Sequence, residues 1–267
     1  MSDVFCTLAN IGQKIGCVLA MFGSLSSRLP STFTIFVNMK NIKLIAFDAD
    51  DTLWVNEINY RNAEAKFTEL MSRYTTAEKA IEVLFRTEIA NLPLLGYGSK
   101  PFIISLIESG IELSGEKLSN NEIIQLIAIG KETMERPMSV YPDVEKVLSL
   151  LSEKYPLVLA TKGDLKEQES KVERSGLKKY FREVEIMSEK HSENYLRIIK
   201  AHNISPEEFL MIGNSFKSDI LPVLEIGGKA IYIPCDITWA HEVVEEIEHP
   251  NLIKLSSITD VVNIIPK

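Results

Sequence analysis

The sequence predicts an α/β protein: a Rossmann-like, doubly wound parallel sheet interrupted by an all-helical insertion. Three observations lead to this expectation. Short apolar runs alternate with helical stretches, each run ends in turn residues, and one long block of helical periodicity follows the first run. Alternation of this kind is typical of parallel strands whose connecting helices cover both faces of a sheet.

Five apolar runs are expected to form strands, because each is short, continuous and bounded by turn residues. They are residues 42–47, 157–160, 184–187, 209–212 and 230–233. Core helices are expected at 144–151, 165–174, 194–202 and 219–225, and the segment 251–266 should add one more strand and helix. The core is therefore predicted to comprise residues 39–54 and 140–267.

The block from 55 to 139 has apolar residues at helical spacing and none of the alternation of strands. Helices are expected within it at 63–74, 77–92, 101–113 and 121–134. A block of 85 residues is too long for a loop, so we expect an inserted helical cap.

The composition excludes several classes of protein. The 267 residues carry 29 basic and 37 acidic side chains, and a net charge of −8 argues against a nucleic-acid binder. With 45% hydrophobic and 25% charged residues, the chain is neither disordered nor collagen-like, and no membrane association is expected. The three cysteines form no CxxC pair and no zinc set, so a reducing compartment, the cytoplasm, is expected.

Residues 1–38 differ from the rest, because only four of the first forty residues are charged. We interpret them as an extension outside the fold, either flexible or arising from a mis-assigned start. A weak signal-like segment is the alternative, since a short apolar run at 15–22 follows Lys14 without a clear cleavage site.

The most specific motif is Asp48-Ala49-Asp50-Asp51-Thr52, directly after the first apolar run. Open parallel sheets bind ligands at the carboxyl ends of their strands, and residues two apart there point the same way. Asp48 and Asp50 would repel each other unless a cation or a proton intervened. The pair suits phosphoryl transfer, with one carboxylate as nucleophile and the other as general acid and base. A plain Asp-rich turn is the alternative.

Two further strand ends carry residues suited to an anion. Thr161-Lys162-Gly163-Asp164 combines a hydroxyl, a glycine and the start of a helix, which together make an anion site. Lys190 follows the third run and offers a positive charge to a phosphate or to a carboxylate nucleophile. Taken singly, a threonine such as Thr161 is more often an ordinary strand-end residue, and a lysine such as Lys190 is more often a solvated surface lysine.

The fourth run ends in the segment 213–219, which supplies oxygen ligands at one more strand end. Mg²⁺ prefers a few oxygen ligands together with water and substrate phosphate. Asp48, the Asp50 carbonyl, and an oxygen of Asn214 or Asp219 would provide such a set.

In this order the four motifs resemble those of the haloacid dehalogenase-like hydrolase superfamily, over about residues 40–267. The resemblance implies a helical cap inserted just after the first motif, a so-called C1 cap. It also implies that Asp48 is a nucleophile that forms an aspartyl-phosphate, that Asp50 is the general acid and base, and that Lys190 offsets charge at the nucleophile. Since dehalogenases of the superfamily lack the second aspartate of the first motif, Asp50 points to phosphate esters.

The same resemblance implies the remaining site residues. The substrate phosphate would be bound by Ala49, Thr161, Lys162 and Gly163, and Mg²⁺ by Asp48, Asp50, Asn214 and Asp219. The fourth motif departs from the common Gly-Asp start, because Asn214 follows Gly213. An amide keeps an oxygen but loses a charge, so metal affinity should fall unless Asp219 takes the inner position.

Substrate choice should lie in the cap, where the segment 96–102 is a Gly-rich, aromatic and basic turn. Our hypothesis is that Tyr97 and Lys100 face the active site and contact the leaving group. A plain helix–helix turn is the alternative. The expected function is an Mg²⁺-dependent phosphomonoester hydrolase of a small phosphorylated metabolite. The alternatives are a phosphosugar mutase of the same superfamily and a non-catalytic phospho-ligand-binding protein.

Overall fold

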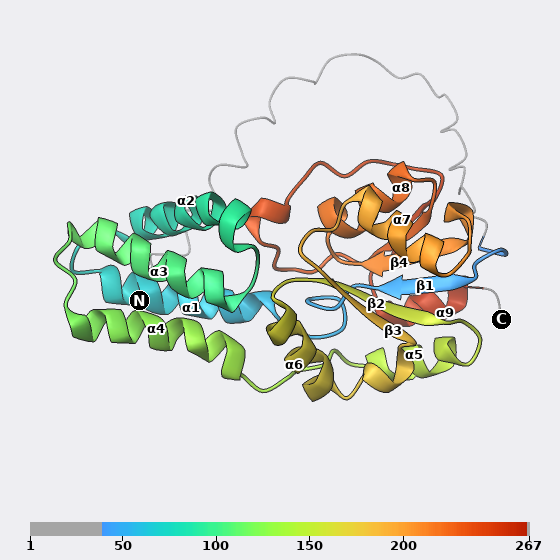
Figure 1. Cartoon of the computed structure of the whole chain (residues 1–267), viewed down its shortest axis with the longest axis horizontal. Coiled ribbons are helices and arrows are strands. Elements are labelled where there is room, and N and C mark those ends of the chain that lie inside the picture. The colour runs from blue at the N-terminus through green and yellow to red at the C-terminus, as the bar shows by residue number, and fades with distance from the viewer. Residues whose placement is uncertain (1–38, 266–267) are drawn as a thin grey trace, which may run out of the picture. The chain divides into compact units, whose positions relative to one another are not determined.

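The computed structural model describes residues 39–265, and its core is a six-stranded parallel sheet in the order β3-β2-β1-β4-β5-β6 (Figure 1). The strands are β1 (Leu44–Phe47), β2 (Leu157–Lys162), β3 (Glu183–Met187), β4 (Phe209–Gly213), β5 (Lys229–Tyr232) and β6 (Leu252–Lys254). β1 pairs with β2 on one side and with β4 on the other, so the strand order reverses there. Ligands of such sheets bind at the carboxyl ends of these central strands.

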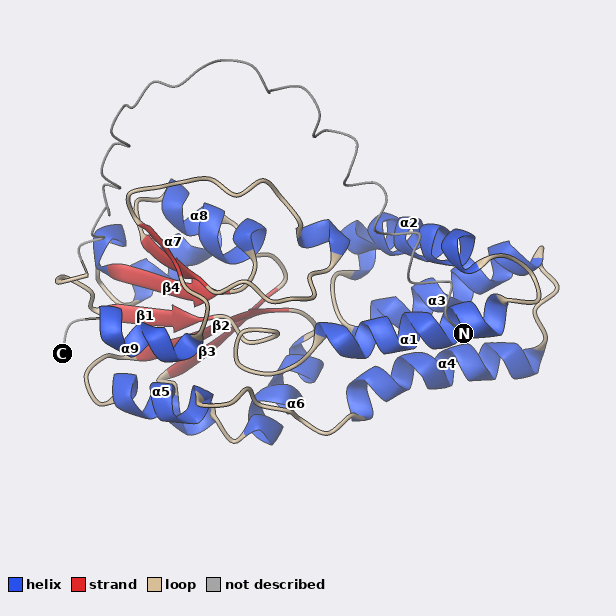
Figure 2. Cartoon of the chain, turned by 180° about the vertical axis from the view of Figure 1, so that it is seen from behind, coloured by secondary structure: helices blue, strands red, loops and turns tan. Residues whose placement is uncertain are grey.

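Helices cover both faces of the sheet, as Figures 1 and 2 show. One face carries α5 (Val144–Ser152) and α9 (Val261–Ile264), and the other carries α7 (Ser192–Ala201) and α8 (Leu221–Glu225). Successive residues of β1 divide between the two layers: Ile45 belongs to the apolar cluster of the first face and Leu44 to that of the second. The predicted doubly wound α/β class is confirmed. The N-terminal extension predicted at 1–38 lies outside the described residues.

The block between β1 and α5 is helical, with α1 (Glu57–Met71), α2 (Ala77–Leu95), α3 (Ser99–Ser114) and α4 (Asn120–Glu135). They share an apolar cluster that includes Phe67, Leu84, Leu106 and Leu126. α1 begins six residues before its expected start at 63. The physical reason is that the Asp51 carboxylate accepts hydrogen bonds from the amides of Asn56 and Glu57, the otherwise unpaired donors of the first turn.

The cap and the core are joined by two chain segments that run antiparallel to each other. Trp54 and Val140 form an antiparallel bridge, the Val55 amide donates to the Ser139 carbonyl at 2.9 Å, and the Tyr141 amide donates to the Leu53 carbonyl at 2.9 Å. The proposed division of the chain, with core at 39–54 and 140–267 and cap at 55–139, falls at this pair of crossings. Both crossings lie next to the first motif, so the cap enters the fold beside Asp48 and Asp50.

Two segments differ from the sequence-based expectation. The helix expected at 219–225 starts as a wider π-helix at Phe216–Ile220 and continues as α8, which has Pro222 at its start. Residues 233–251 form a long connection that contains one short 3₁₀ turn at Ala240–Glu242. Within the described residues, no helix is long and apolar enough to cross a lipid bilayer.

Candidate active site

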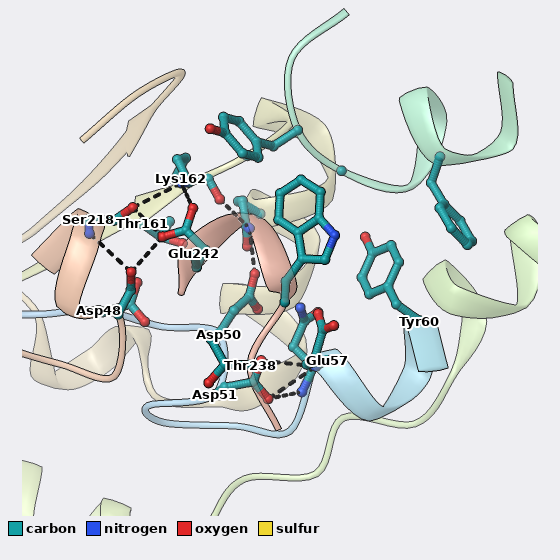
Figure 3. A pocket seen from close by; sticks show the side chains of 18 of the residues that line it. Asp48, Asp50, Asp51, Glu57, Tyr60, Thr161, Lys162, Ser218, Thr238 and Glu242 are labelled. Atoms are coloured by element: carbon teal, nitrogen blue, oxygen red, sulfur yellow. Dashed lines mark hydrogen bonds and ion pairs between the residues drawn. The ribbon is translucent and has the colours of Figure 1, made fainter. Parts of the chain in front are cut away.

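A pocket of about 190 Å³ lies where the carboxyl ends of the strands meet the cap. Its lining comes from three sources: the strand ends with Asp48, Thr161 and Lys190, the cap helices, and the connection after β5. Figure 3 shows Asp48, Asp50 and Thr161 on the core side of this pocket, and Glu57 and Tyr60 on the first cap helix. The motifs found in the sequence at four separate strand ends therefore converge on one cavity.

Lys190 binds the first aspartate of the motif. Its Nζ lies 2.5 Å from Asp48 Oδ1 and 2.7 Å from Asp219 Oδ1, and the lysine is only 4% exposed. Burial alone would lower the pKa of Lys190, but the carboxylates of Asp219 and Asp48 outweigh it and hold the pKa well above its ordinary value. Lys190 therefore stays charged and offsets the charge of Asp48.

Asp219 is held in place by its own contacts. Its second oxygen, Oδ2, accepts the Ser215 amide at 2.9 Å, and a Cβ at Gly213 would lie 2.2 Å from that oxygen. Glycine is needed at position 213 because Asp219 occupies the space of a side chain. One carboxylate oxygen of Asp219 accepts from Lys190 and the other accepts from the Ser215 amide. Asp219 is therefore positioned as a partner of Lys190, and another residue of the fourth motif faces the first motif.

Asn214 is the residue of the fourth motif that faces the first motif. One terminal atom of its amide lies 2.9 Å from Thr52 Oγ1, and 3.1 Å from both Asp48 Oδ2 and the Asp50 carbonyl oxygen. The orientation of an amide is assigned from its surroundings. A nitrogen at this point donates to all three oxygens, whereas an oxygen at this point completes a set of three oxygen ligands.

The orientation of Asn214 that places its amide oxygen toward the first motif fits Mg²⁺. In an octahedron with metal–oxygen distances of about 2.1 Å, neighbouring ligand oxygens are separated by about 3 Å. The separations of 3.1 Å from the Asn214 amide to Asp48 Oδ2 and to the Asp50 carbonyl match this spacing. Between residues 39 and 265, no group of three or more His, Cys, Asp and Glu side chains could hold a metal. The oxygen set here draws instead on a carboxylate, an amide and a main-chain carbonyl.

Asp50 is surrounded by donors, two of them from α6 (Leu165–Ser175) and one from Trp54. Lys171 Nζ lies 2.9 Å from Asp50 Oδ2, Gln168 Nε2 donates to the same oxygen at 2.8 Å, and Trp54 Nε1 donates to Oδ1 at 2.7 Å. Burial raises the pKa of Asp50, but the charge of Lys171 and these hydrogen bonds outweigh it and bring the pKa below its ordinary value. Asp50 is therefore a carboxylate with a dedicated counter-ion.

The second motif places an unpaired hydroxyl in the pocket. Thr161 is 1% exposed, lines the pocket, and its Oγ1 has no hydrogen-bond partner within the described part of the chain. A buried hydroxyl without a partner costs free energy unless a ligand satisfies it. The Gly163 amide, in contrast, donates to the Met187 carbonyl at 3.1 Å, and a Cβ at Gly163 would lie 2.7 Å from Gln168 Nε2. Gly163 thus makes room for Gln168, the residue that holds Asp50.

Lys162 is bound by a residue that sequence reasoning missed, Glu242. Lys162 Nζ lies 2.7 Å from Glu242 Oε1 and 4.0 Å from the centre of the Tyr97 ring, while Ser215 and Ser218 donate to Glu242 Oε2. Burial raises the pKa of Glu242, but Lys162 and these hydrogen bonds lower it to about 2. No motif in the sequence could reveal Glu242, because it lies in the irregular connection after β5.

The two cap residues of the hypothesis have different surroundings. Tyr97 lines the pocket, and its ring packs edge-on against Trp239 with centroids 6.1 Å apart. The expectation that Lys100 faces the pocket is wrong. Lys100 is an exposed residue in the first turn of α3, and its Nζ lies 2.9 Å from Asp164, whose carboxylate attracts it to the surface between cap and core.

Glu167 connects the core to the cap and was also missed. Asp164 caps α6 by accepting the Glu167 amide at 3.0 Å, but the Glu167 side chain does not turn back to complete a capping box. Instead, Glu167 Oε2 accepts the Ser99 amide at 2.8 Å and Oε1 accepts the Ser99 hydroxyl at 3.0 Å. A buried carboxylate of the core therefore binds the N-terminus of the cap helix α3.

Fold and site together define a Rossmann-like α/β protein with paired carboxylates at the carboxyl end of its first strand. A family model for the haloacid dehalogenase-like hydrolases matches residues 42–227, and the chain belongs to this family. The predicted superfamily is confirmed.

Among solved structures, the chain is similar to a haloacid dehalogenase-like family hydrolase from Xanthomonas campestris. The identity is 36% over 84% of this chain and 92% of that one, with a TM-score of 0.76. A predicted phosphoglycolate phosphatase from Haemophilus somnus shares 16% identity over 86% of this chain and all of that one, with a TM-score of 0.57.

A HAD-hydrolase, YfnB from Bacillus subtilis, was solved with bound magnesium. It shares 15% identity over 85% of this chain and 99% of that one, with a TM-score of 0.57. Other similar structures are 2-haloacid dehalogenases, at 19% and 15% identity. Because structures at such low identity include both phosphatases and dehalogenases, their likeness to this chain shows the fold alone. A comparison with curated proteins gave no match.

Proposed function

We propose that the protein is an Mg²⁺-dependent phosphomonoester hydrolase that acts on a small phosphorylated metabolite through an aspartyl-phosphate. The observation that carries the proposal is the pair Asp48 and Asp50 at one strand end. Asp48 is paired with a buried ammonium, and Asp50 lies beside it in the same pocket. A nucleophile and a separate acid and base are the two groups that this reaction needs.

In the first half of the reaction, a carboxylate oxygen of Asp48 attacks the phosphorus, and the bond from phosphorus to the alcohol oxygen breaks. The alcohol oxygen takes a proton from Asp50, and the phosphoryl group stays on Asp48. In the second half, Asp50 removes a proton from water, the water oxygen attacks the phosphorus, and the bond to Asp48 breaks. Inorganic phosphate leaves, Asp48 is a free carboxylate again, and Asp50 holds the proton taken from water, which it releases to solvent once the phosphate has gone.

Asp50 must hold a proton before it can act as an acid, whereas in the free protein it is a carboxylate paired with Lys171. A phosphate dianion that enters beside Asp50 disfavours a second negative charge and raises its pKa. Lys171 then keeps the carboxyl group aimed at the leaving oxygen, and the carboxylate form returns for the hydrolytic half-reaction.

The phosphate is bound by groups on both sides of Asp48. Thr161 Oγ1, which lacks a partner in the described residues, would donate to a phosphoryl oxygen. Asp48, the Asp50 carbonyl and Asn214 would hold Mg²⁺, which neutralises charge on the phosphate when it is bound. Ala49 and the main chain at Lys162 remain predicted phosphate contacts from the resemblance.

The experiment is a phosphate-release assay with p-nitrophenyl phosphate and a panel of sugar phosphates, nucleotides and cofactor phosphates, with and without EDTA. Wild type should release phosphate only with Mg²⁺, and Asp48→Asn should lose at least about 10³-fold of the activity, because the nucleophile is gone. Asp236→Asn, at an exposed position outside the pocket, is the matched control. Full activity of Asp48→Asn, or halide release from 2-chloropropionate in place of phosphate release, would refute the proposal.

A further inference from the structure

The cap side of the pocket is unusually acidic. Glu57, Tyr60 and Glu64 lie on one face of α1, and Glu88 comes from α2, and all four line the same pocket as Asp48. Figure 3 shows Glu57 and Tyr60 on this first cap helix, on the side away from Thr161 and Lys162. The part of a substrate beyond its phosphate would meet these carboxyl groups.

The cluster has fewer positive charges than carboxyl groups. Arg61 pairs with Glu64 at 2.9 Å and with Glu57 at 3.2 Å, and it also donates to the Thr238 carbonyl. The side chain of Glu88 forms no hydrogen bond or ion pair with any residue between 39 and 265. Three carboxyl groups therefore share one guanidinium, so a positive charge is lacking.

Glu57 carries a second and independent sign of a missing ligand. It is only 9% exposed, and its Oε1 receives no hydrogen bond from any described residue, because the Arg61 guanidinium is close but poorly aligned. A buried carboxylate oxygen without a donor costs free energy unless a donor arrives from outside. The site is thus built for a group that donates hydrogen bonds.

Aromatic rings form the walls between these carboxyl groups. Tyr60 packs edge-on against Phe102 with ring centroids 5.1 Å apart, and Tyr97 packs in the same way against Trp239. All four rings line the pocket. Aromatic faces combined with carboxylates are the chemistry that recognises ammonium groups in proteins.

The cations of the core side are already paired. Lys190 is bound by Asp48 and Asp219, Lys171 by Asp50 and Glu167, and Lys162 by Glu242. Among the residues that line the pocket, no lysine is left to receive a carboxylate on the leaving group. An anionic leaving group is therefore disfavoured.

We infer that the substrate is a phosphomonoester whose alcohol part carries an ammonium group, and that Glu57, Glu64 and Glu88 of the cap bind this group beside the rings of Tyr60 and Phe102. The inference rests on the proposed function, since it assigns the phosphate to the Asp48 side of the pocket. Electrostatics agrees with it: burial raises the pKa of Glu57 and of Glu88 to about 8, as expected for carboxyl groups that lack a counter-ion.

The test measures binding without turnover, on the full chain with Mg²⁺ present. Calorimetry compares 3-aminopropylphosphonate with butylphosphonate, which has a methyl group where the first has an ammonium. The amino compound should bind at least tenfold more tightly. Equal affinities, or no binding of either compound, would overturn the inference.

Variants assign the preference to the cap. Glu57→Gln and Glu88→Gln should each reduce the ratio of the two affinities by at least fivefold. Glu78→Gln is the matched control, because Glu78 is an exposed glutamate on the same helix as Glu88, and it should keep the ratio of wild type. A ratio that survives both pocket variants would overturn the assignment to these residues.

Turnover separates this inference from the proposed function. The kcat/KM for 2-aminoethyl phosphate should exceed that for propyl phosphate at least tenfold. Hydrolysis of p-nitrophenyl phosphate without any such preference would overturn the ammonium site and leave the phosphatase standing. A preference between the phosphonates without hydrolysis of any ester would overturn the phosphatase and leave the ammonium site standing.

Discussion

Lys171 Nζ lies 2.9 Å from Asp50 Oδ2 and 2.8 Å from Asn56 Oδ1, so a lysine of α6 neutralises the second carboxylate of the first motif and also contacts the residue that precedes α1. Lys171 is 6% exposed. Burial would lower its pKa, but the carboxylates of Asp50 and Glu167 raise it above its ordinary value. The pair is therefore ionised on both sides at neutral pH.

Lys171→Met should destabilise the protein by about 3 kcal/mol at pH 7, because it leaves Asp50 as a buried charge without a partner. The pKa of Asp50 in the variant should lie above its unfolded value, so the loss should shrink as the pH falls toward 4 and Asp50 gains a proton. Urea unfolding at pH 4.5 and pH 7 measures both values.

The double variant Asp50→Asn with Lys171→Met is the control for this first prediction. It removes both charges and should recover most of the stability that Lys171→Met loses, since no uncompensated charge remains. If the double variant instead loses as much stability as Asp50→Asn and Lys171→Met lose together, the interpretation of the contact as an ion pair would be contradicted.

Gly213→Ala should disrupt the site through Asp219. A Cβ at position 213 would lie 2.2 Å from Asp219 Oδ2 and 2.5 Å from its Cγ, so the carboxylate must move and take Lys190 with it. We expect activity to fall by about 10²-fold, as for a displacement of about 1 Å within a catalytic centre. Steady-state kinetics on the folded variant measures the loss.

Gly130→Ala is the matched control for Gly213→Ala. Its added Cβ would lie equally close, at 2.2 Å, to Cγ1 of Ile103 inside the cap. The stability should fall, but the activity of the folded protein should remain, because Gly130 lies outside the pocket lining. Equal activity losses in the two variants would show that overlap in general, and not the position of Asp219, is responsible.

The sequence predicted the parts of the site that lie at strand ends. Asp48, Lys190 and Asn214 each follow a strand and Thr161 lies near the carboxyl end of β2, and parallel pairing brings such positions to one edge without further information. The apolar periodicity of the block 55–139 likewise predicted its four helices, α1 to α4.

Residues that act through tertiary contacts were not predictable in this way. Glu242 lies in an irregular connection, and Lys100 was assigned to the pocket although a carboxylate of the core attracts it to the surface. A signal did exist on α6: Glu167 and Lys171 are spaced i, i+4 in a helix that begins at a strand end, so both face the site.

Glu88→Gln should stabilise the ligand-free protein at high pH. The pKa of Glu88 is about 8 in the fold and about 4.5 in the unfolded chain, so the folded state holds a proton that the unfolded state releases. Stability of wild type therefore falls as the pH rises from about 4.5 to about 8. Because glutamine carries no such proton, the variant should gain about 4 kcal/mol over wild type between pH 5 and pH 8.5.

Thermal melts of both proteins at pH 5, 7 and 8.5 measure this difference. The melting temperatures should nearly coincide at pH 5 and separate with rising pH. Glu78→Gln, on the exposed part of the same helix, should show no gain at pH 8.5. A gap between Glu88→Gln and wild type that stays constant with pH would contradict the raised pKa.

Glu167→Ala should loosen the cap at its contact with the core. The Glu167 carboxylate is 5% exposed and accepts both the amide and the hydroxyl of Ser99 in the first turn of α3. A charge-assisted hydrogen bond of this kind contributes about 1.5–3 kcal/mol, so its loss should raise amide hydrogen exchange in the segment 97–105 by about 10- to 100-fold. Exchange followed by mass spectrometry measures this change.

Lys100→Ala is the matched comparison, because it breaks another contact between α3 and α6. The Lys100 side chain is 54% exposed, and a solvated ion pair such as that with Asp164 contributes only about 0–1 kcal/mol. Exchange in 97–105 should therefore rise less than about fivefold in Lys100→Ala. Since the two contacts lie one residue apart on α3, the two variants compare a buried contact with an exposed one at nearly the same point of the cap. Equal exchange in the two variants would show that the buried Glu167 carboxylate does not hold the cap.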